Sequence, residues 1–167
     1  MTVAVGPIRL GAFGCLRSPG IPITWAITGA TAGIGRAVAL RLAAVGASVI
    51  VHGRDEQRGA ETVKEIAAAG GKARFVAADL SSSEDVLRLA AEAGEVDVLI
   101  NNAGIYRFAG TPATTAGMFD AQMVVNSRAP MLLVGALAPG MAARGCGVIV
   151  NVSPAAATTP VRDSGAN

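Results

Sequence analysis

The chain has few aromatic residues, few cysteines and little net charge. Of its 167 residues, four are Phe, one is Trp and one is Tyr, although 51% are apolar. Its two cysteines, Cys15 and Cys146, give neither a disulfide framework nor a metal-ligand spacing. A formal net charge of +2, without a basic stripe or interleaved aromatics, argues against a nucleic-acid partner. We expect one domain with a core of small aliphatic side chains.

The sequence also lacks an apolar run long enough to span a bilayer, and we expect no membrane partner. The longest stretch, residues 131–143, is short and is interrupted by a Pro-Gly pair. Residues 1–22 contain several Gly and Pro residues, and two arginines interrupt their apolar part, which is not typical of a signal peptide. We interpret residues 1–22 as a disordered extension or the product of an early start site, residues 23–167 as the domain, and the location as cytoplasmic.

The most informative feature that is present is a glycine-rich turn at residues 28–35. It follows an apolar run at 23–27 and opens an amphipathic run, which predicts a strand, a tight turn and a helix. Glycines allow the backbone to approach a ligand closely, and the start of the helix favours a diphosphate. A glycine-rich turn without a ligand is the alternative, because the spacing is Gly-x-x-x-Gly-x-Gly rather than the commoner fingerprint. The candidate cofactor-binding residues here are Thr28, Gly29, Thr31, Gly33, Ile34 and Gly35.

The second predicted strand, residues 48–52, ends at Gly53 and Arg54. In a βαβ unit this place meets the adenosine ribose, where an acidic residue binds the 2′-hydroxyl and an arginine accommodates a 2′-phosphate. Arg54 therefore favours NADP over NAD as the cofactor, unless Asp55 beside it neutralises its charge. His52, the only histidine, is interpreted as a structural residue.

Strands and helices alternate along the rest of the chain. The pattern predicts strands at 73–78, 96–100 and 148–152, helices at 55–69 and 114–143, and a further helix that starts at a capping box from Ser81 to Glu84. This alternation predicts an α/β fold, a Rossmann-type doubly wound parallel sheet in three α/β/α layers with ligands at the carboxyl ends of the strands. The expected inward residues are Ile34, Val38, Leu42 and Val45 on the first helix, Ala60, Val63, Ile66 and Ala67 on the second, and Val86, Leu89, Ala90 and Ala93 on the third.

Four motifs in order resemble those of the short-chain dehydrogenase/reductase family. They are the glycine turn, Ala-Asp-Leu at 78–80, Asn-Asn-Ala-Gly at 101–104 and Asn-Val-Ser at 151–153. The resemblance covers residues 23 to 160 and implies hydride transfer between NADP or NAD and a small-molecule alcohol or ketone. It further implies that Asp79 and Leu80 border the adenine ring, that Asn101 stabilises the sheet, and that Ala103 and Gly104 lie along the cofactor. Read without the resemblance, Asp79 is a charge at a helix start.

Asn126 is a candidate for the proton relay. Pro130 cannot donate to the carbonyl of Asn126, so that carbonyl is free to bind a water. The resemblance implies an asparagine in that role at this position. The alternative is a polar residue that faces a loop.

The catalytic residues that the resemblance implies are missing. Pro154 stands where the family has its carbonyl-polarising serine, and Ser153 lies one residue early. The tyrosine position is Asn167, the lysine position has no counterpart, and the only tyrosine is Tyr106. We therefore expect a chain truncated before the Tyr-x-x-x-Lys motif, incomplete at the C-terminal edge of its sheet and with impaired or no catalysis. A non-catalytic nucleotide-binding module and a decayed remnant are the alternatives, and the helix at 114–143 is the expected site of any homo-oligomer.

Overall fold

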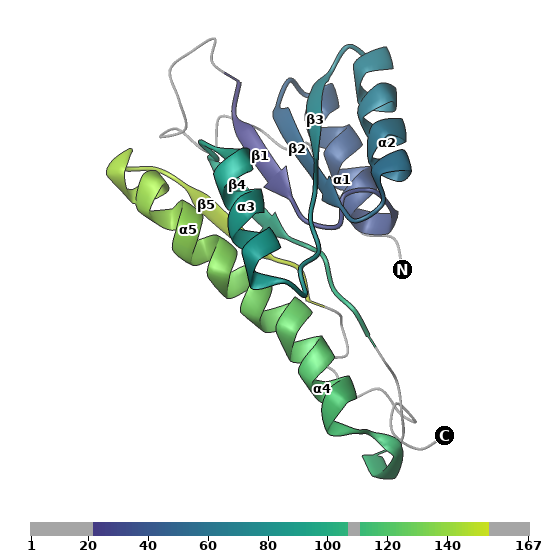
Figure 1. Cartoon of the computed structure of the whole chain (residues 1–167). Coiled ribbons are helices and arrows are strands. Elements are labelled where there is room, and N and C mark those ends of the chain that lie inside the picture. Colours follow the sequence, from purple (N-terminus) through teal and green to yellow (C-terminus); the bar gives the residue numbers. More distant parts are fainter. Residues whose placement is uncertain (1–21, 107–110, 154–167) are drawn as a thin grey trace.

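The computed structural model describes residues 22–106 and 111–153, and the expectations for residues 1–21, Pro154 and Asn167 fall outside them. Five strands pair in parallel in the order β3-β2-β1-β4-β5. Their bounds are Thr24–Ile27 (β1), Ser48–Gly53 (β2), Lys72–Ala77 (β3), Val98–Asn101 (β4) and Val148–Asn151 (β5). Figure 1 shows this sheet with helices on both sides. The predicted Rossmann-type sheet is confirmed, and each strand lies within two residues of its expected bounds.

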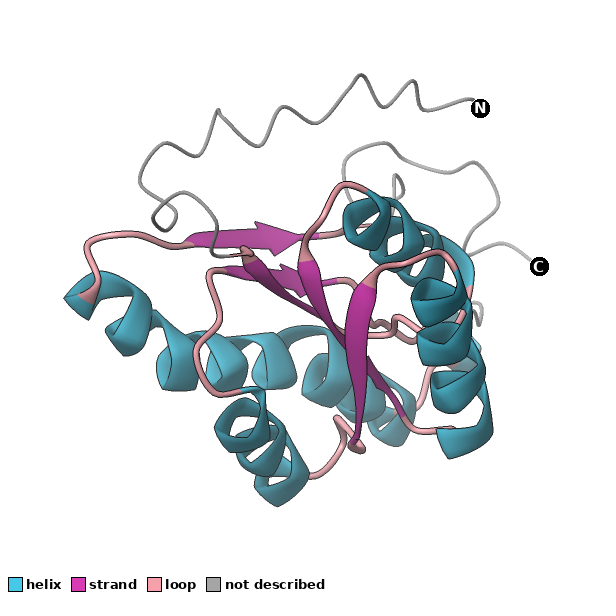
Figure 2. Cartoon of the chain, turned by 90° about the horizontal axis from the view of Figure 1, so that it is seen from above, coloured by secondary structure: helices cyan, strands magenta, loops and turns pink. Residues whose placement is uncertain are grey.

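The helices form two layers around the sheet. On one face α1 (Gly33–Ala44) packs beside α2 (Glu56–Ala68), and on the other α3 (Ser83–Ala93) packs against α5 (Ala129–Ala143). Figure 2 shows the sheet between the two layers. A short 3-10 turn, η2 (Thr111–Ala113), precedes α4 (Ala116–Met123), whose N-cap is Thr115. The predicted long helix is thus α4, a π-helical turn η3 (Val124–Arg128) and α5 in continuous succession.

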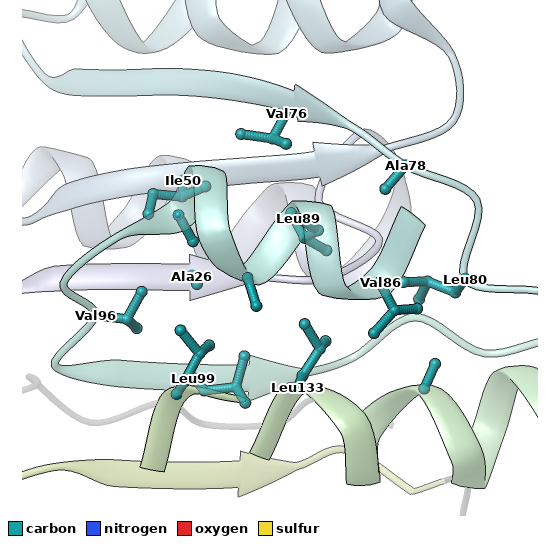
Figure 3. Close-up of a cluster of buried hydrophobic side chains, with 14 of the residues drawn as sticks. Ala26, Ile50, Val76, Ala78, Leu80, Val86, Leu89, Val96, Leu99 and Leu133 are labelled. Carbon is teal, nitrogen blue, oxygen red and sulfur yellow. The ribbon is translucent and has the colours of Figure 1, made fainter. Parts of the chain in front are cut away.

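Alternating side chains of the strands form the two halves of the core. Ala26, Ile50 and Leu99 point into a cluster with Val86 and Leu89 of α3, to which α5 also contributes. Figure 3 shows this cluster between α3 and the strands. The neighbouring strand residues bury their side chains on the opposite face, against α1 and α2. Because parallel strands buried on both faces need apolar residues at every position, the strands read as continuous apolar runs.

The predicted face of α3 is confirmed, whereas those of α1 and α2 are only partly right: Leu42 and Ile66 are buried and Val38 and Val63 pack against the core, but the other four residues are exposed. On α1, Ile34 is 68% exposed and Val45 is 39% exposed. The buried residues of α1 are Gly35, Ala39, Leu42 and Ala43, because small residues allow the helix backbone itself to approach the sheet. On α2, Gly59, Thr62 and Ile66 are buried instead of Ala60 and Ala67, because the ring of Phe75 lies where a side chain at 59 would be.

The predicted capping box is also wrong in detail. The N-cap of α3 is Ser82, whose Oγ accepts from the backbone N–H of Asp85 at 3.2 Å. Ser81 instead donates its backbone N–H to Oδ1 of Asp79 at 2.9 Å. The turn before α3 is therefore built around Asp79, one of the predicted cofactor residues.

β5 is an edge strand of the described sheet. Ile149, Val150 and Val152 are 36%, 39% and 43% exposed. The expected apolar edge is therefore present in the part of the chain that the structure describes. Cys146 before this strand is disulfide-bonded, a cross-link that the expectation of no disulfide framework did not include. No helix in the described ranges is long and apolar enough to cross a membrane.

Candidate cofactor site

Two adjoining cavities lie at the carboxyl ends of the strands. The first, of about 340 Å³, follows β1, β2 and β3, and the second, of about 620 Å³, follows β4 and β5. Residues 102–105 line both cavities. In the sheet, β2 lies on one side of β1 and β4 lies on the other, so the strand order reverses at β1. Such a reversal is the topological switch point at which α/β sheets bind ligands.

The structure brings most of the predicted site residues to these cavities. Gly29, Thr31, Arg54, Asp79, Leu80, Ala103 and Gly104 line the first, and Ile34, Asn101, Ala103, Gly104, Asn126 and Ser153 line the second. Thr28, Gly33 and Gly35 line neither. Ala32, His52, Gly53, Asn102, Ile105 and Val125 are lining residues that sequence reasoning did not name as site residues.

The glycines of the turn have different tasks. Gly29 and Gly33 have φ of +66° and +53°, a conformation that favours glycine. Gly35 is buried, and a Cβ there would collide with the carbonyl of Gly29 and stand 2.5 Å from Nδ2 of Asn102. Gly35 is therefore required for close packing. The N-cap of α1, Ala32, makes no side-chain cap hydrogen bond, and the first turn carries no acidic residue. The start of α1 thus keeps its partial positive charge at the first cavity.

Thr28 and Asn102 join the ends of β1 and β4. Oγ1 of Thr28 accepts the backbone N–H groups of Asn102 and Ala103, both at 3.0 Å. Nδ2 of Asn102 donates to the carbonyls of Thr28 at 2.9 Å and Gly29 at 3.3 Å. These bonds fix the segment shared by the two cavities to the glycine turn. The Asn-Asn-Ala-Gly motif was the signal that could have identified Asn102 in this role.

His52 ties the glycine turn to the ends of β2 and β3. It is 3% exposed; its Nδ1 accepts from the N–H of Gly29 at 3.2 Å, and its Nε2 lies 3.1 Å from the carbonyl of Ala78. This pair of partners requires the neutral tautomer with its proton on Nε2. Burial is the main reason that the pKa of His52 is lowered, and the charge of Arg54 lowers it further.

Arg54 and Asp79 border the outer part of the first cavity. Asp55 caps α2 and pairs with Arg58, whose Nε lies 2.7 Å from Oδ2 of Asp55. Arg54 has no ion pair within the described ranges, so Asp55 does not neutralise it there. The backbone N–H of Ser81 is the main cause that holds the pKa of Asp79 below its usual value. Asp79 is therefore a carboxylate at neutral pH, and its Oδ1 is occupied by Ser81.

Asparagine side chains organise the second cavity. Nδ2 of Asn101 donates to Oδ1 of Asn151 at 2.9 Å, across β4 and β5. Oδ1 of Asn126 accepts from the N–H of Ile105 at 2.9 Å, and its Nδ2 donates to the carbonyl of Ile105 at 2.8 Å. The side chain of Asn126 therefore holds the loop after β4, as the loop-facing alternative predicted. The role of its backbone carbonyl in a proton relay stays a prediction.

Ser153 and Tyr106 are exposed and line the same cavity as Asn126. Among the described residues, no group of three or more His, Cys, Asp or Glu could hold a metal ion. The arrangement offers an anion-binding turn, a cation at one end and a partly apolar cavity at the other.

A model of the family described as short chain dehydrogenase matches residues 24–166. The chain belongs to this family. An uncharacterised oxidoreductase of Thermotoga maritima is 40% identical over 129 residues, which are 76% of this chain and 51% of that protein. The chain thus spans about half the length of that family member.

Solved structures of family members agree with this assignment. A metagenomic short-chain oxidoreductase in complex with NADP superimposes with a TM-score of 0.79 at 39% identity, over 86% of this chain and 67% of that one. A 7α-hydroxysteroid dehydrogenase complexed with NADH and 7-oxo glycochenodeoxycholic acid gives a TM-score of 0.78 at 31% identity, over 83% of this chain and 56% of the other.

Proposed function

We propose that this chain binds NADP(H) across the two cavities, as the cofactor-binding part of an oxidoreductase that acts on an alcohol or ketone. The observation that carries the proposal is the pair of adjoining cavities that share residues 102–105 at the switch point of the sheet. Family members of similar fold were solved with NADP and with NADH. The cofactor would supply or accept the hydride, and the residues of this chain would position it.

The residues present fit a dinucleotide. The uncapped start of α1 would take the diphosphate, because its N–H groups and helix dipole favour an anion. The first cavity would hold the adenosine, with Asp79 and Leu80 beside the adenine ring. The second cavity, with Ile34 and Asn126 in its lining, would hold the nicotinamide and the substrate. The proposed binding unit is residues 23–167, which the family match from residue 24 supports, with residues 1–22 as an extension.

We further propose a preference for NADP(H) over NAD(H). Position 53 carries no acid to bind the ribose 2′-hydroxyl, and Arg54 is exposed beside the first cavity without an ion pair in the described part of the chain. A guanidinium suits a phosphate because it can donate two parallel hydrogen bonds.

We propose that the chain as written turns over no substrate. Its only lysines, Lys64 and Lys72, lie on α2 and at the amino end of β3. Lys72 is therefore at the end of the sheet opposite the cavities. Tyr106, the only tyrosine, lines the second cavity but has no lysine four residues after it. The second candidate function is a nucleotide-binding module without catalysis.

We propose that the chain associates with a second copy of itself through α4 and α5. Phe119, Met123 and Met131 are 57%, 44% and 64% exposed on this continuous helix. Phe119 and Met123, four residues apart, lie on one face of α4. Size-exclusion chromatography with light scattering tests this, and a monomer at micromolar concentration would contradict it.

Fluorescence titration with NADPH and NADH tests the cofactor proposal. We expect tighter binding of NADPH, and Arg54→Ala should remove most of the difference. Arg58→Ala is the matched control, because Arg58 is engaged by Asp55 rather than directed at the cavity. Failure to bind either cofactor with folded protein would refute the proposed function.

A further inference from the structure

Gly53 is a glycine for reasons of space. It lies in β2 and is absent from the glycines with positive φ, so its backbone conformation is open to other residues. A Cβ added there would stand 2.5 Å from Cγ2 and 2.8 Å from Oγ1 of Thr31. Rotation of Thr31 can move these two atoms, but its own Cβ would still be 3.3 Å from the added atom, so one of the two residues must also shift by a few tenths of an ångström. Thr31 therefore opposes a side chain at position 53.

The backbone near Thr31 and that of β2 are held in place next to this contact. The N–H of Ala30 donates to the carbonyl of His52 at 2.8 Å, and the N–H of Gly29 donates to Nδ1 of the same residue at 3.2 Å. These bonds join the two residues before Thr31 to the residue before Gly53. The glycine turn cannot withdraw from β2 without breaking them, so the space at position 53 stays closed.

We propose that Thr31 keeps an acidic side chain out of position 53 and so preserves the selectivity of the site for the phosphorylated ribose of NADP(H). This rests on the proposed function. Thr31, Gly53 and Arg54 line the same cavity. A carboxylate at 53 would repel a 2′-phosphate and accept the 2′-hydroxyl of NAD(H). Selectivity then depends on the cation at 54 and on the lack of an acid at 53, and Thr31 acts only on the second of these, by limiting which side chains fit at position 53.

The proposal predicts that an acidic residue at position 53 can tighten NADH binding only when Thr31 is replaced by a shorter residue. Gly53→Asp alone should weaken NADPH binding at least tenfold without tightening NADH binding, because the new side chain displaces the turn. Gly53→Asp combined with Thr31→Ala should bind NADH about tenfold more tightly than the original chain, the scale of one hydrogen bond to a charged group. Thr31→Ala alone should change the NADPH-to-NADH ratio less than about threefold.

The experiment measures both dissociation constants by fluorescence titration for the original chain and the three variants. Selectivity that moves to NADH equally in Gly53→Asp with and without Thr31→Ala would overturn the proposal. So would a double variant that still prefers NADPH. Non-additive behaviour of the two changes would support it, because residues in contact couple and distant ones do not.

A second measurement separates this proposal from the cofactor proposal. Urea unfolding of Gly53→Ala, Thr31→Ala and their combination reports the steric contact without any ligand. We expect Gly53→Ala to lower the free energy of unfolding, and the addition of Thr31→Ala to restore most of that loss. Gly135→Ala is the control and should not lower the free energy of unfolding, because its added Cβ meets nothing within 4 Å. A Gly53→Ala change that costs no stability would overturn the exclusion by Thr31 even if NADPH binds. If Thr31→Ala does restore the stability lost in Gly53→Ala but neither cofactor binds, the steric contact stands, whereas the proposed function and the proposed selectivity are refuted.

Discussion

Replacement of His52 should damage the glycine turn in a way that depends on which ring nitrogen is lost. His52→Leu removes the acceptor for the N–H of Gly29 and the donor to the carbonyl of Ala78. Each buried polar group left without a partner costs about 1–3 kcal/mol, so the loss is about 2–6 kcal/mol. That is a large part of the roughly 5–15 kcal/mol of a typical domain. His52→Asn places an amide oxygen near Nδ1 and should keep the bond to Gly29, whereas His52→Gln should keep only the bond to Ala78.

Protonation of His52 should act like a mutation of the same residue. Its pKa in the folded chain lies below the ordinary value of 6.5, chiefly because it is buried. The stability contributed by the neutral ring is therefore complete above about pH 6.5 and falls as the pH drops from 6.5 toward the folded-state pKa. The slope in that window is at most about 1.4 kcal/mol per pH unit. His52 is the only histidine, so no other side chain with an ordinary pKa titrates there.

Urea unfolding at pH 7.5, 6.5 and 5.5, for the original chain and for His52→Asn, measures this effect. The free energy of unfolding should fall between pH 6.5 and 5.5 in the original chain and should be flatter in His52→Asn. Carboxylates contribute equally to both proteins, so their difference isolates the imidazole. Equal pH profiles for the two proteins would refute the assigned tautomer and its role. If the bond to Gly29 positions the turn, the His52→Asn variant should keep its affinity for NADPH. The His52→Gln variant, which loses that bond, should bind NADPH more weakly.

Three further predictions follow from the site. Arg54→Ala should weaken NADPH binding by about 1–3 kcal/mol and leave NADH binding unchanged, and equal losses for both cofactors in titrations would remove Arg54 from the ribose site. Gly33→Val should abolish NADPH binding, because a branched residue at φ +53° strains the turn by about 1–2 kcal/mol and crowds the diphosphate; retained affinity in a folded variant would place the cofactor elsewhere. NADPH oxidation with a panel of ketones and quinones should show no useful turnover, since loss of an acid–base group alone typically costs about 10²–10⁴-fold. A rate near 1 s⁻¹ that Tyr106→Phe abolishes would identify Tyr106 as a missed proton donor.

The parallel sheet and the edge at which the cavities lie could be predicted from the sequence. The apolar runs are continuous, and polar or glycine-rich motifs follow them at the same end of each strand. Only part of the contact face of α1 could be predicted: Leu42 was, but Gly35 and Ala39 contribute little hydrophobicity and yet allow the helix backbone to approach the sheet closely. The hydrogen bonds of His52 to Gly29 and Ala78 could not be predicted either, because they join three chain segments that only the tertiary fold brings together.

Ile34 carried two predictions, and they conflict. The glycine motif made it a candidate cofactor-binding residue, whereas periodicity assigned it to the core; it is 68% exposed and lines the second cavity with Tyr106 and Val152, which are 51% and 43% exposed, so the core assignment is the error. An isolated apolar residue on a surface needs no explanation, whereas several that border one cavity indicate a surface used for binding. Periodicity cannot separate these cases, because an apolar side chain directed at a ligand and one directed at the core follow the same pattern. The exposed apolar wall of the second cavity is consistent with a planar, uncharged group such as a reduced nicotinamide, while the charged residue Arg54 lies at the first cavity, where the proposed 2′-phosphate would be.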